Sequence, residues 1–132
     1  MGTKKEIRSW SSDTLLESIQ NALRGIYHIL TNHRNARLIF LSFIFAMVCG
    51  FYLGISKLEI FVLSVAIMVV FLAEVINTLI EDLSNLITEE FHPKIKLIKD
   101  VAAGVVLVAV LFAGILGFFV FLNRVILLWQ QL

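Results

Sequence analysis

The chain has 132 residues, of which 59% are hydrophobic and 16% charged, with a formal net charge of +1. At this length two independent cores would bury too little surface, so we expect one domain over residues 1–132. A soluble protein this small with a mean hydropathy of +0.92 would expose much apolar surface to water, and a bilayer removes that problem. The near-neutral charge provides no basic field, so we expect no nucleic-acid partner.

The first predicted element is an amphipathic helix over residues 13–34. Its apolar side chains recur at spacings of three and four residues, at Leu16, Ile19, Leu23, Ile26, Tyr27 and Leu30. Thr14 and Glu17 have the spacing of a capping box. Such a helix could pack on soluble protein, but beside membrane spans it is better suited to the membrane interface, where we expect it. We expect residues 1–12 to form a flexible N-terminus.

Three transmembrane helices are expected next, over residues 36–56, 58–86 and 93–128. Residues 38–56 contain no Asp, Glu, Lys, Arg or His, and residues 101–122 are uncharged. Each run is close to the roughly 20 residues that cross the hydrocarbon core as a helix. Residues 60–73 form a third apolar run, which Glu74 interrupts. Pro93, the only proline, is well tolerated in a first helical turn and predicts that the last helix begins there.

The orientation of these helices follows from the distribution of Lys and Arg. One side of the predicted membrane collects nine of the eleven basic residues: Lys4, Lys5, Arg8, Arg24, Arg34, Arg37, Lys94, Lys96 and Lys99. The other side has Lys57 and Arg124. The positive-inside rule therefore places the N-terminus and the second loop in the cytoplasm and the C-terminus outside.

The second span carries a stripe of polar residues. On a helical wheel they fall within about 100° of one another, at Glu74, Asn77, Thr78, Glu81 and Asn85. Ionisable residues inside membrane helices usually face protein or water and serve a function. Two carboxylates and an amide on one face suit Mg²⁺, which is often held by one or two carboxylates together with substrate phosphates. The alternative is that these side chains reach the cytoplasmic headgroups and only anchor the helix.

Lysines gather in the first turns of the last helix, at Lys94, Lys96 and Lys99. The helix dipole disfavours cations at that end unless an anion is present, and a bound phosphate would resolve the conflict. The alternative is a positive-inside anchor, which we favour for Lys94 and Lys96. Lys99, followed directly by Asp100, is the better phosphate candidate. The chain has no GxxxxGK[ST] or GxGxxG motif, so any phosphate chemistry must use membrane helices.

The stretch "AEVINTLIEDLSNLITEEFHPKIKLIKDVAAGVVL" resembles the signature region of the prokaryotic integral-membrane diacylglycerol kinases and their relatives, the undecaprenol kinases. The segment "ALRGIYHILTNHRNARL" is also similar to that family. The resemblance implies a homotrimer of three-span subunits, each with an interfacial helix, in the bacterial inner membrane with active sites at the cytoplasmic face. It implies an ATP- and Mg²⁺-dependent transfer of the γ-phosphoryl group to the hydroxyl of a membrane lipid, undecaprenol or diacylglycerol.

The resemblance also assigns roles to residues on the stripe. Glu74 matches the general base and Glu81 the metal-binding carboxylate. His33, four residues before Arg37, stands where many members have a glutamate that is a second metal ligand. Asn85 stands where an aspartate is usual. Because histidine is a poorer Mg²⁺ ligand than a carboxylate, these two departures bear on metal binding.

The nucleotide site that the resemblance implies uses five further positions. Lys99 and Asp100 match a pair near the nucleotide phosphates, while Glu90 and His92 match the loop over the nucleotide. Asn77 matches the motif partner of the general base and is grouped with them. Two other functions remain open at this point: a non-catalytic membrane scaffold derived from a kinase, and a small proton or ion conductor.

Overall fold

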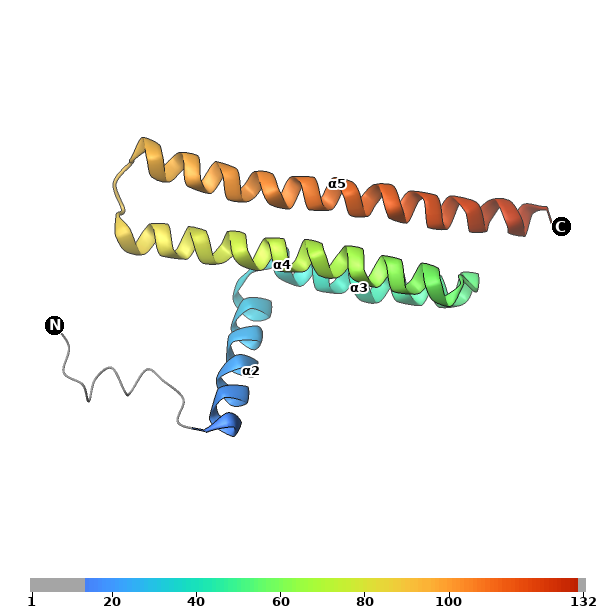
Figure 1. The fold of residues 1–132 in the computed structure, drawn as a ribbon, viewed down its shortest axis with the longest axis horizontal. Helices are drawn as coiled ribbons and strands as arrows, with labels where there is room; N and C mark the ends of the chain where they lie inside the picture. The colour runs from blue at the N-terminus through green and yellow to red at the C-terminus, as the bar shows by residue number, and fades with distance from the viewer. Residues whose placement is uncertain (1–13, 131–132) are drawn as a thin grey trace. The chain divides into compact units, whose positions relative to one another are not determined.

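The computed structural model describes residues 14–130, and the expectation for residues 1–12 lies outside that range. The described part is all-helical and contains four helices, α2 to α5 (Figure 1). Three of them are long and apolar enough to cross a membrane. The chain divides into two compact units, one up to residue 34 and one from residue 35, and each is described separately.

Helix α2 (Leu15–Asn32) makes up the described part of the first unit. It begins because the Thr14 side chain accepts a hydrogen bond from the backbone N–H of Glu17 at 3.2 Å. It ends where His33 adopts extended backbone angles. None of its residues is buried, and its apolar side chains, Leu16, Leu23 and Tyr27 among them, are exposed. The helix therefore has an exposed apolar face among the described residues.

Helix α3 (Arg34–Leu53) ends in a Schellman motif. The N–H of Ile55 donates to the carbonyl of Gly50, and the N–H of Gly54 donates to that of Phe51, both at 3.1 Å. Gly54 has a φ of +63°, in the left-handed region that glycine adopts without steric cost. Ile55 packs so closely on Gly50 that a Cβ there would lie 2.6 Å from its Cδ1. This compact turn reverses the chain into the next helix.

Helix α4 (Lys57–Ile87) starts with a capping box. The Ser56 side chain accepts from the N–H of Glu59 at 3.3 Å, while the Glu59 carboxylate accepts from the N–H of Ser56 at 2.7 Å. The N–H groups of Ser56 and Glu59, which the start of a helix would leave unpaired, are thereby satisfied at the turn between α3 and α4. Helix α4 ends at Ile87, and the N–H of the capping residue Thr88 donates to the carbonyl of Ser84.

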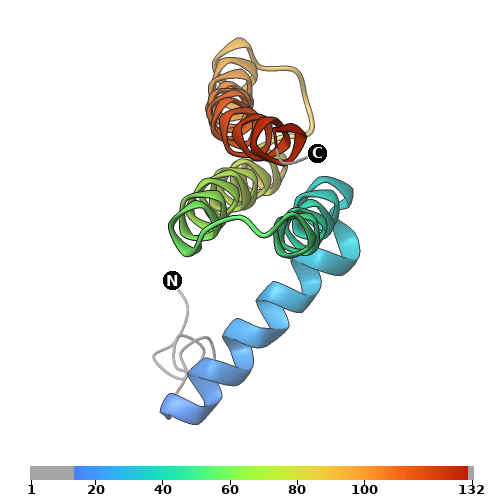
Figure 2. The same ribbon diagram turned by 90° about the vertical axis from the view of Figure 1, so that its right-hand side faces the viewer.

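Helix α5 (Pro93–Trp129) runs antiparallel to α4 along its length, and α3 lies on another side of α4 (Figures 1 and 2). Most large apolar side chains of these helices are exposed, as expected for surfaces that face lipid. The buried positions concentrate on α4, where they are Leu63, Ala66, Val70, Ala73, Glu74, Asn77, Thr78 and Ser84. Leu63 lies 3.9 Å from the Cβ position of Gly117, so this small residue of α5 packs against α4.

Arg124 connects the far end of α5 to the α3–α4 turn. Its Nε donates a hydrogen bond to the backbone carbonyl of Leu53, the last residue of α3. A Cβ at Gly54 would lie 2.9 Å from a guanidinium nitrogen of Arg124. The side chain thus satisfies a carbonyl that the end of α3 leaves free, and it occupies the space next to the glycine.

Candidate active site

The polar stripe of α4 has a buried part and an exposed part. Glu74 is 5% exposed, Asn77 8% and Thr78 4%, whereas Glu81 and Asn85 are exposed. Because Glu74 is buried within the chain, its carboxylate does not face lipid, where a charge costs several kcal/mol. The stripe therefore passes from the protein interior to an accessible surface within three turns of one helix.

Asn77 joins the two parts of this stripe. Its side-chain Nδ2 donates a hydrogen bond to Oε1 of Glu81 at 3.0 Å. Its Oδ1 is buried and has no hydrogen-bond partner among the described residues. An unpaired buried carbonyl oxygen is costly, and such groups commonly await a water or a ligand. Asn77 can therefore orient Glu81 with one end of its amide and accept a donor with the other.

The two carboxylates differ in their expected depth in a membrane. A crossing of about 20 residues that starts at Ile60 ends near Leu79. Glu74 lies about five residues, or roughly 7.5 Å, inside that boundary, and Glu81 lies just beyond it. On this estimate Glu74 lies deeper in the hydrocarbon region than Glu81.

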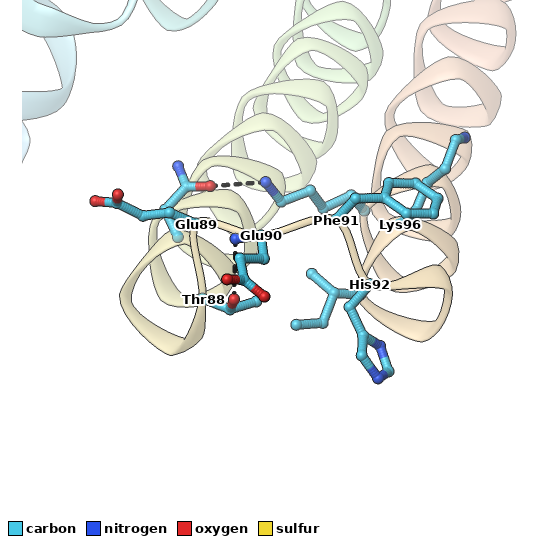
Figure 3. Close-up of a pocket in the computed structure, with 9 residues that line it drawn as sticks. Thr88, Glu89, Glu90, Phe91, His92 and Lys96 are labelled. Atoms are coloured by element: carbon cyan, nitrogen blue, oxygen red, sulfur yellow. Dashed lines mark hydrogen bonds between the residues drawn. The ribbon is translucent and has the colours of Figure 1, made fainter.

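A pocket opens where α4 and α5 meet their connecting loop (Figure 3). Its volume of about 710 Å³ is within the range of small-molecule sites. It is lined by Asn85, Thr88, Glu89, Glu90, Phe91, His92, Ile95, Lys96 and Lys99. The Thr88 side chain accepts from the N–H of Glu90 at 3.0 Å, and Glu90 turns back toward Thr88, while the His92 ring points away from the loop (Figure 3).

The lysines of this pocket have different partners. Lys99 donates to Oδ1 of Asn85 at 2.7 Å, which links α5 to the exposed end of the stripe. Lys96 forms an ion pair with Asp100 at 2.6 Å, one turn along α5. Asp100 is exposed and does not line the pocket, although Lys99 next to it does.

The structure brings together most of the residues that the sequence singled out, in two groups. Glu74, Asn77 and Glu81 share the stripe, while Glu90, His92 and Lys99 share the pocket. Asn85 belongs to both groups. His33 lies at the end of α2 in the first unit, where its ring is 6.0 Å from that of His28. The pairing of Asn85 with Lys99 was not anticipated, and no sequence motif would have revealed it.

The side chains of this site could bind Mg²⁺ only together with ligands from the substrate. Within residues 14–130 no group of three or more His, Cys, Asp or Glu side chains could hold a metal ion. Glu81 offers one exposed carboxylate, oriented by Asn77. Mg²⁺ is commonly bound by one or two carboxylates while substrate phosphates and waters complete its coordination. The residues present therefore suit a metal that arrives with a polyphosphate.

Comparison with known proteins decides the family. The sequence profile of the prokaryotic diacylglycerol kinases matches residues 20–121, a stretch that contains the whole stripe and the whole pocket. The chain belongs to this family. With three membrane-spanning helices, it is a membrane protein of the prokaryotic diacylglycerol kinase family.

Two curated members of the family are similar over most of the chain. The undecaprenol kinase of Bacillus subtilis is 33% identical over 108 residues, which cover 82% of this chain and 88% of that protein. The diacylglycerol kinase of a Synechocystis species is 29% identical over 120 residues, covering 88% of this chain and 69% of that protein. The resemblance noted in the sequence is thereby confirmed, and both relatives are named as lipid kinases.

Proposed function

We propose that this lipid kinase transfers the γ-phosphoryl group of ATP, with Mg²⁺, to the hydroxyl of a membrane lipid alcohol. The observation that carries the proposal is Asn77, which is buried, bonded to Glu81 and left with an unpaired carbonyl oxygen. Asn77 lies between Glu74, which is deeper in the membrane, and Glu81, which is nearer its surface. In a member of this family, that arrangement supports a site where the lipid substrate meets the nucleotide.

In this proposal Glu74 is the general base. It accepts the proton of the lipid hydroxyl as that oxygen bonds to the γ-phosphorus and the bond from the γ-phosphorus to the bridging oxygen of ADP breaks. Its depth, about 7.5 Å inside the hydrocarbon boundary, suits a hydroxyl carried by a lipid. Asn77 Oδ1 is available to accept a hydrogen bond from the incoming hydroxyl or from a water beside it.

The remaining groups bind and orient the nucleotide. Glu81 would hold the Mg²⁺, whose contribution is to neutralise charge on the β- and γ-phosphates. Lys99 donates to phosphate oxygens from the pocket, and Glu90 and His92 are available for the rest of the nucleotide. Phosphoryl transfer requires mostly positioning and charge stabilisation, which this set of residues can supply. Asp100 supports the site through its ion pair with Lys96.

The location of the enzyme is part of the same proposal. The basic residues around the pocket favour the cytoplasmic side of a bacterial inner membrane. The exposed apolar face of α2 favours a position in the membrane interface. A homotrimer is the proposed assembly, with the exposed faces of the transmembrane helices available for contacts between subunits.

Undecaprenol is the acceptor that we favour over diacylglycerol, because the undecaprenol kinase of Bacillus subtilis has the higher identity of the two relatives and is covered over more of its length. The test uses purified full-length protein in mixed micelles with Mg²⁺ and γ-labelled ATP, and offers each lipid separately and then both together. We expect labelled undecaprenyl phosphate, formed only when Mg²⁺ is present. Labelled phosphatidate alone would show that diacylglycerol is the acceptor. The absence of labelled lipid with both substrates would contradict the proposed function.

A further inference from the structure

Lys99 is held in place by a neutral group. Its Nζ donates to the amide oxygen of Asn85 at 2.7 Å. The other lysine of the pocket, Lys96, forms an ion pair with the carboxylate of Asp100. Lys99 is half-buried and lines the pocket. Asn85 therefore orders the ammonium group of Lys99 but, being neutral, does not cancel its positive charge.

We propose that Asn85 is a positioning residue that sets the affinity of the pocket for the polyphosphate of the nucleotide, by fixing Lys99 while leaving its positive charge available. The inference rests on the proposed function, because it assigns a role within the same nucleotide site. It differs from the roles given above in that Asn85 acts through Lys99 and does not itself need to touch the substrate.

Two physical effects support this role. A lysine side chain has many rotamers, and ordering it when a ligand binds costs free energy that Asn85 removes in advance. The ammonium group has three N–H donors, and the amide oxygen uses one of them, so two remain for phosphate oxygens. The pocket also contains the carboxylates of Glu89 and Glu90, which repel a polyphosphate. An uncancelled Lys99 offsets that repulsion, whereas a carboxylate at position 85 would pair with Lys99 and add to it.

The experiment compares Asn85→Ala and Asn85→Asp in the full-length enzyme in micelles, with Asn123→Ala as the control. Asn123 is an exposed amide of α5 outside the pocket. We expect Asn85→Ala to raise the KM for ATP about tenfold, the factor that about 1.4 kcal/mol represents, with kcat within about twofold of wild type. Asn85→Asp keeps a hydrogen-bond acceptor for Lys99, but its carboxylate would pair with the charge of Lys99. It should therefore also raise the KM for ATP, and this KM should increase less with salt concentration than the KM of the wild type. Asn123→Ala should keep the wild-type KM.

The outcomes separate this inference from the proposed function. A wild-type KM in Asn85→Ala, or a lower KM in Asn85→Asp, would overturn the role of Asn85 while the kinase reaction stands. If Asn85→Ala does not fold, Asn85→Asp decides, because a purely structural tether predicts no change in KM or in its salt dependence. If the wild-type protein phosphorylates neither lipid, the proposed function fails, and equilibrium dialysis with Mg·ATP tests the same rank order of affinities.

Discussion

Asn77 donates a hydrogen bond to Glu81 at 3.0 Å, so a buried amide orients an exposed carboxylate one turn further along α4. The carboxylate of a flexible glutamate is thereby directed before any ligand binds. Groups that orient metal ligands in this way affect metal affinity strongly, even though they do not contact the metal. The relationship makes Asn77 a direct test of how Glu81 is used.

We predict that Asn77→Ala raises the Mg²⁺ concentration needed for half-maximal lipid phosphorylation by about tenfold or more, because Glu81 loses its orienting partner. The measurement is a Mg²⁺ titration of initial rates at saturating ATP. Asp82→Asn is the matched control, because Asp82 is an exposed residue next to Glu81 but lies outside the stripe. Superimposable titration curves for Asn77→Ala and wild type would contradict this role.

Replacement of Glu74 by glutamine should reduce kcat by about 10² to 10⁴, the range that general bases contribute. The variant keeps nearly the same shape and removes the charge, so helicity and elution volume in micelles should match those of wild type. The KM for ATP should change little, since the nucleotide pocket does not include Glu74. Turnover within about twofold of wild type would assign the base elsewhere.

Gly54→Ala should lower the thermal midpoint in micelles. A non-glycine residue at a φ of +63° costs about 1–2 kcal/mol, and the new Cβ would lie 2.9 Å from a nitrogen of Arg124. Gly25→Ala is the control, because Gly25 is helical and a Cβ there meets no atom within 4 Å. We expect that control to unfold at or slightly above the wild-type midpoint. Equal midpoints for the two variants would show that the turn tolerates a side chain.

The apolar face of α2 should contact lipid. In a Cys49→Ser background, a spin label at Leu23 should be reached by oxygen dissolved in the bilayer. A label at Asn21, on the opposite face of the helix, should be reached by a water-soluble relaxation agent. Accessibility is measured by electron paramagnetic resonance in vesicles. Similar accessibility at the two positions would place α2 away from the interface.

Much of the helical structure follows from local sequence, because apolar runs and caps are local signals. Pro93 stands at the first position of α5, where its missing N–H costs nothing. The first span was predicted to continue to residue 56, but α3 ends at Leu53 because Gly54 takes a left-handed conformation. The second span was predicted to begin at residue 58, and α4 begins at Lys57, directly after the Ser56 cap whose spacing to Glu59 is that of a capping box.

The partners of the site residues could not be predicted in the same way. Lys96 and Lys99 lie three residues apart on one helix, and both are near the end of α4. Which of them reaches Asn85 depends on how α4 and α5 are rotated and aligned against each other. That alignment results from packing along the whole pair of helices. The sequence therefore indicated candidate residues, while their pairing required the fold.

Two polar bonds hold α5 near its opposite ends, Lys99 to Asn85 and Arg124 to the carbonyl of Leu53. They are separated by about 37 Å of helix, somewhat more than the hydrocarbon thickness of a bilayer. A slide of α5 past its neighbours by one turn, about 5.4 Å, would break both bonds at once. The distance between Glu74 and Lys99 along the helix axes is therefore set by the protein itself. Bilayers of different thickness would leave that distance unchanged.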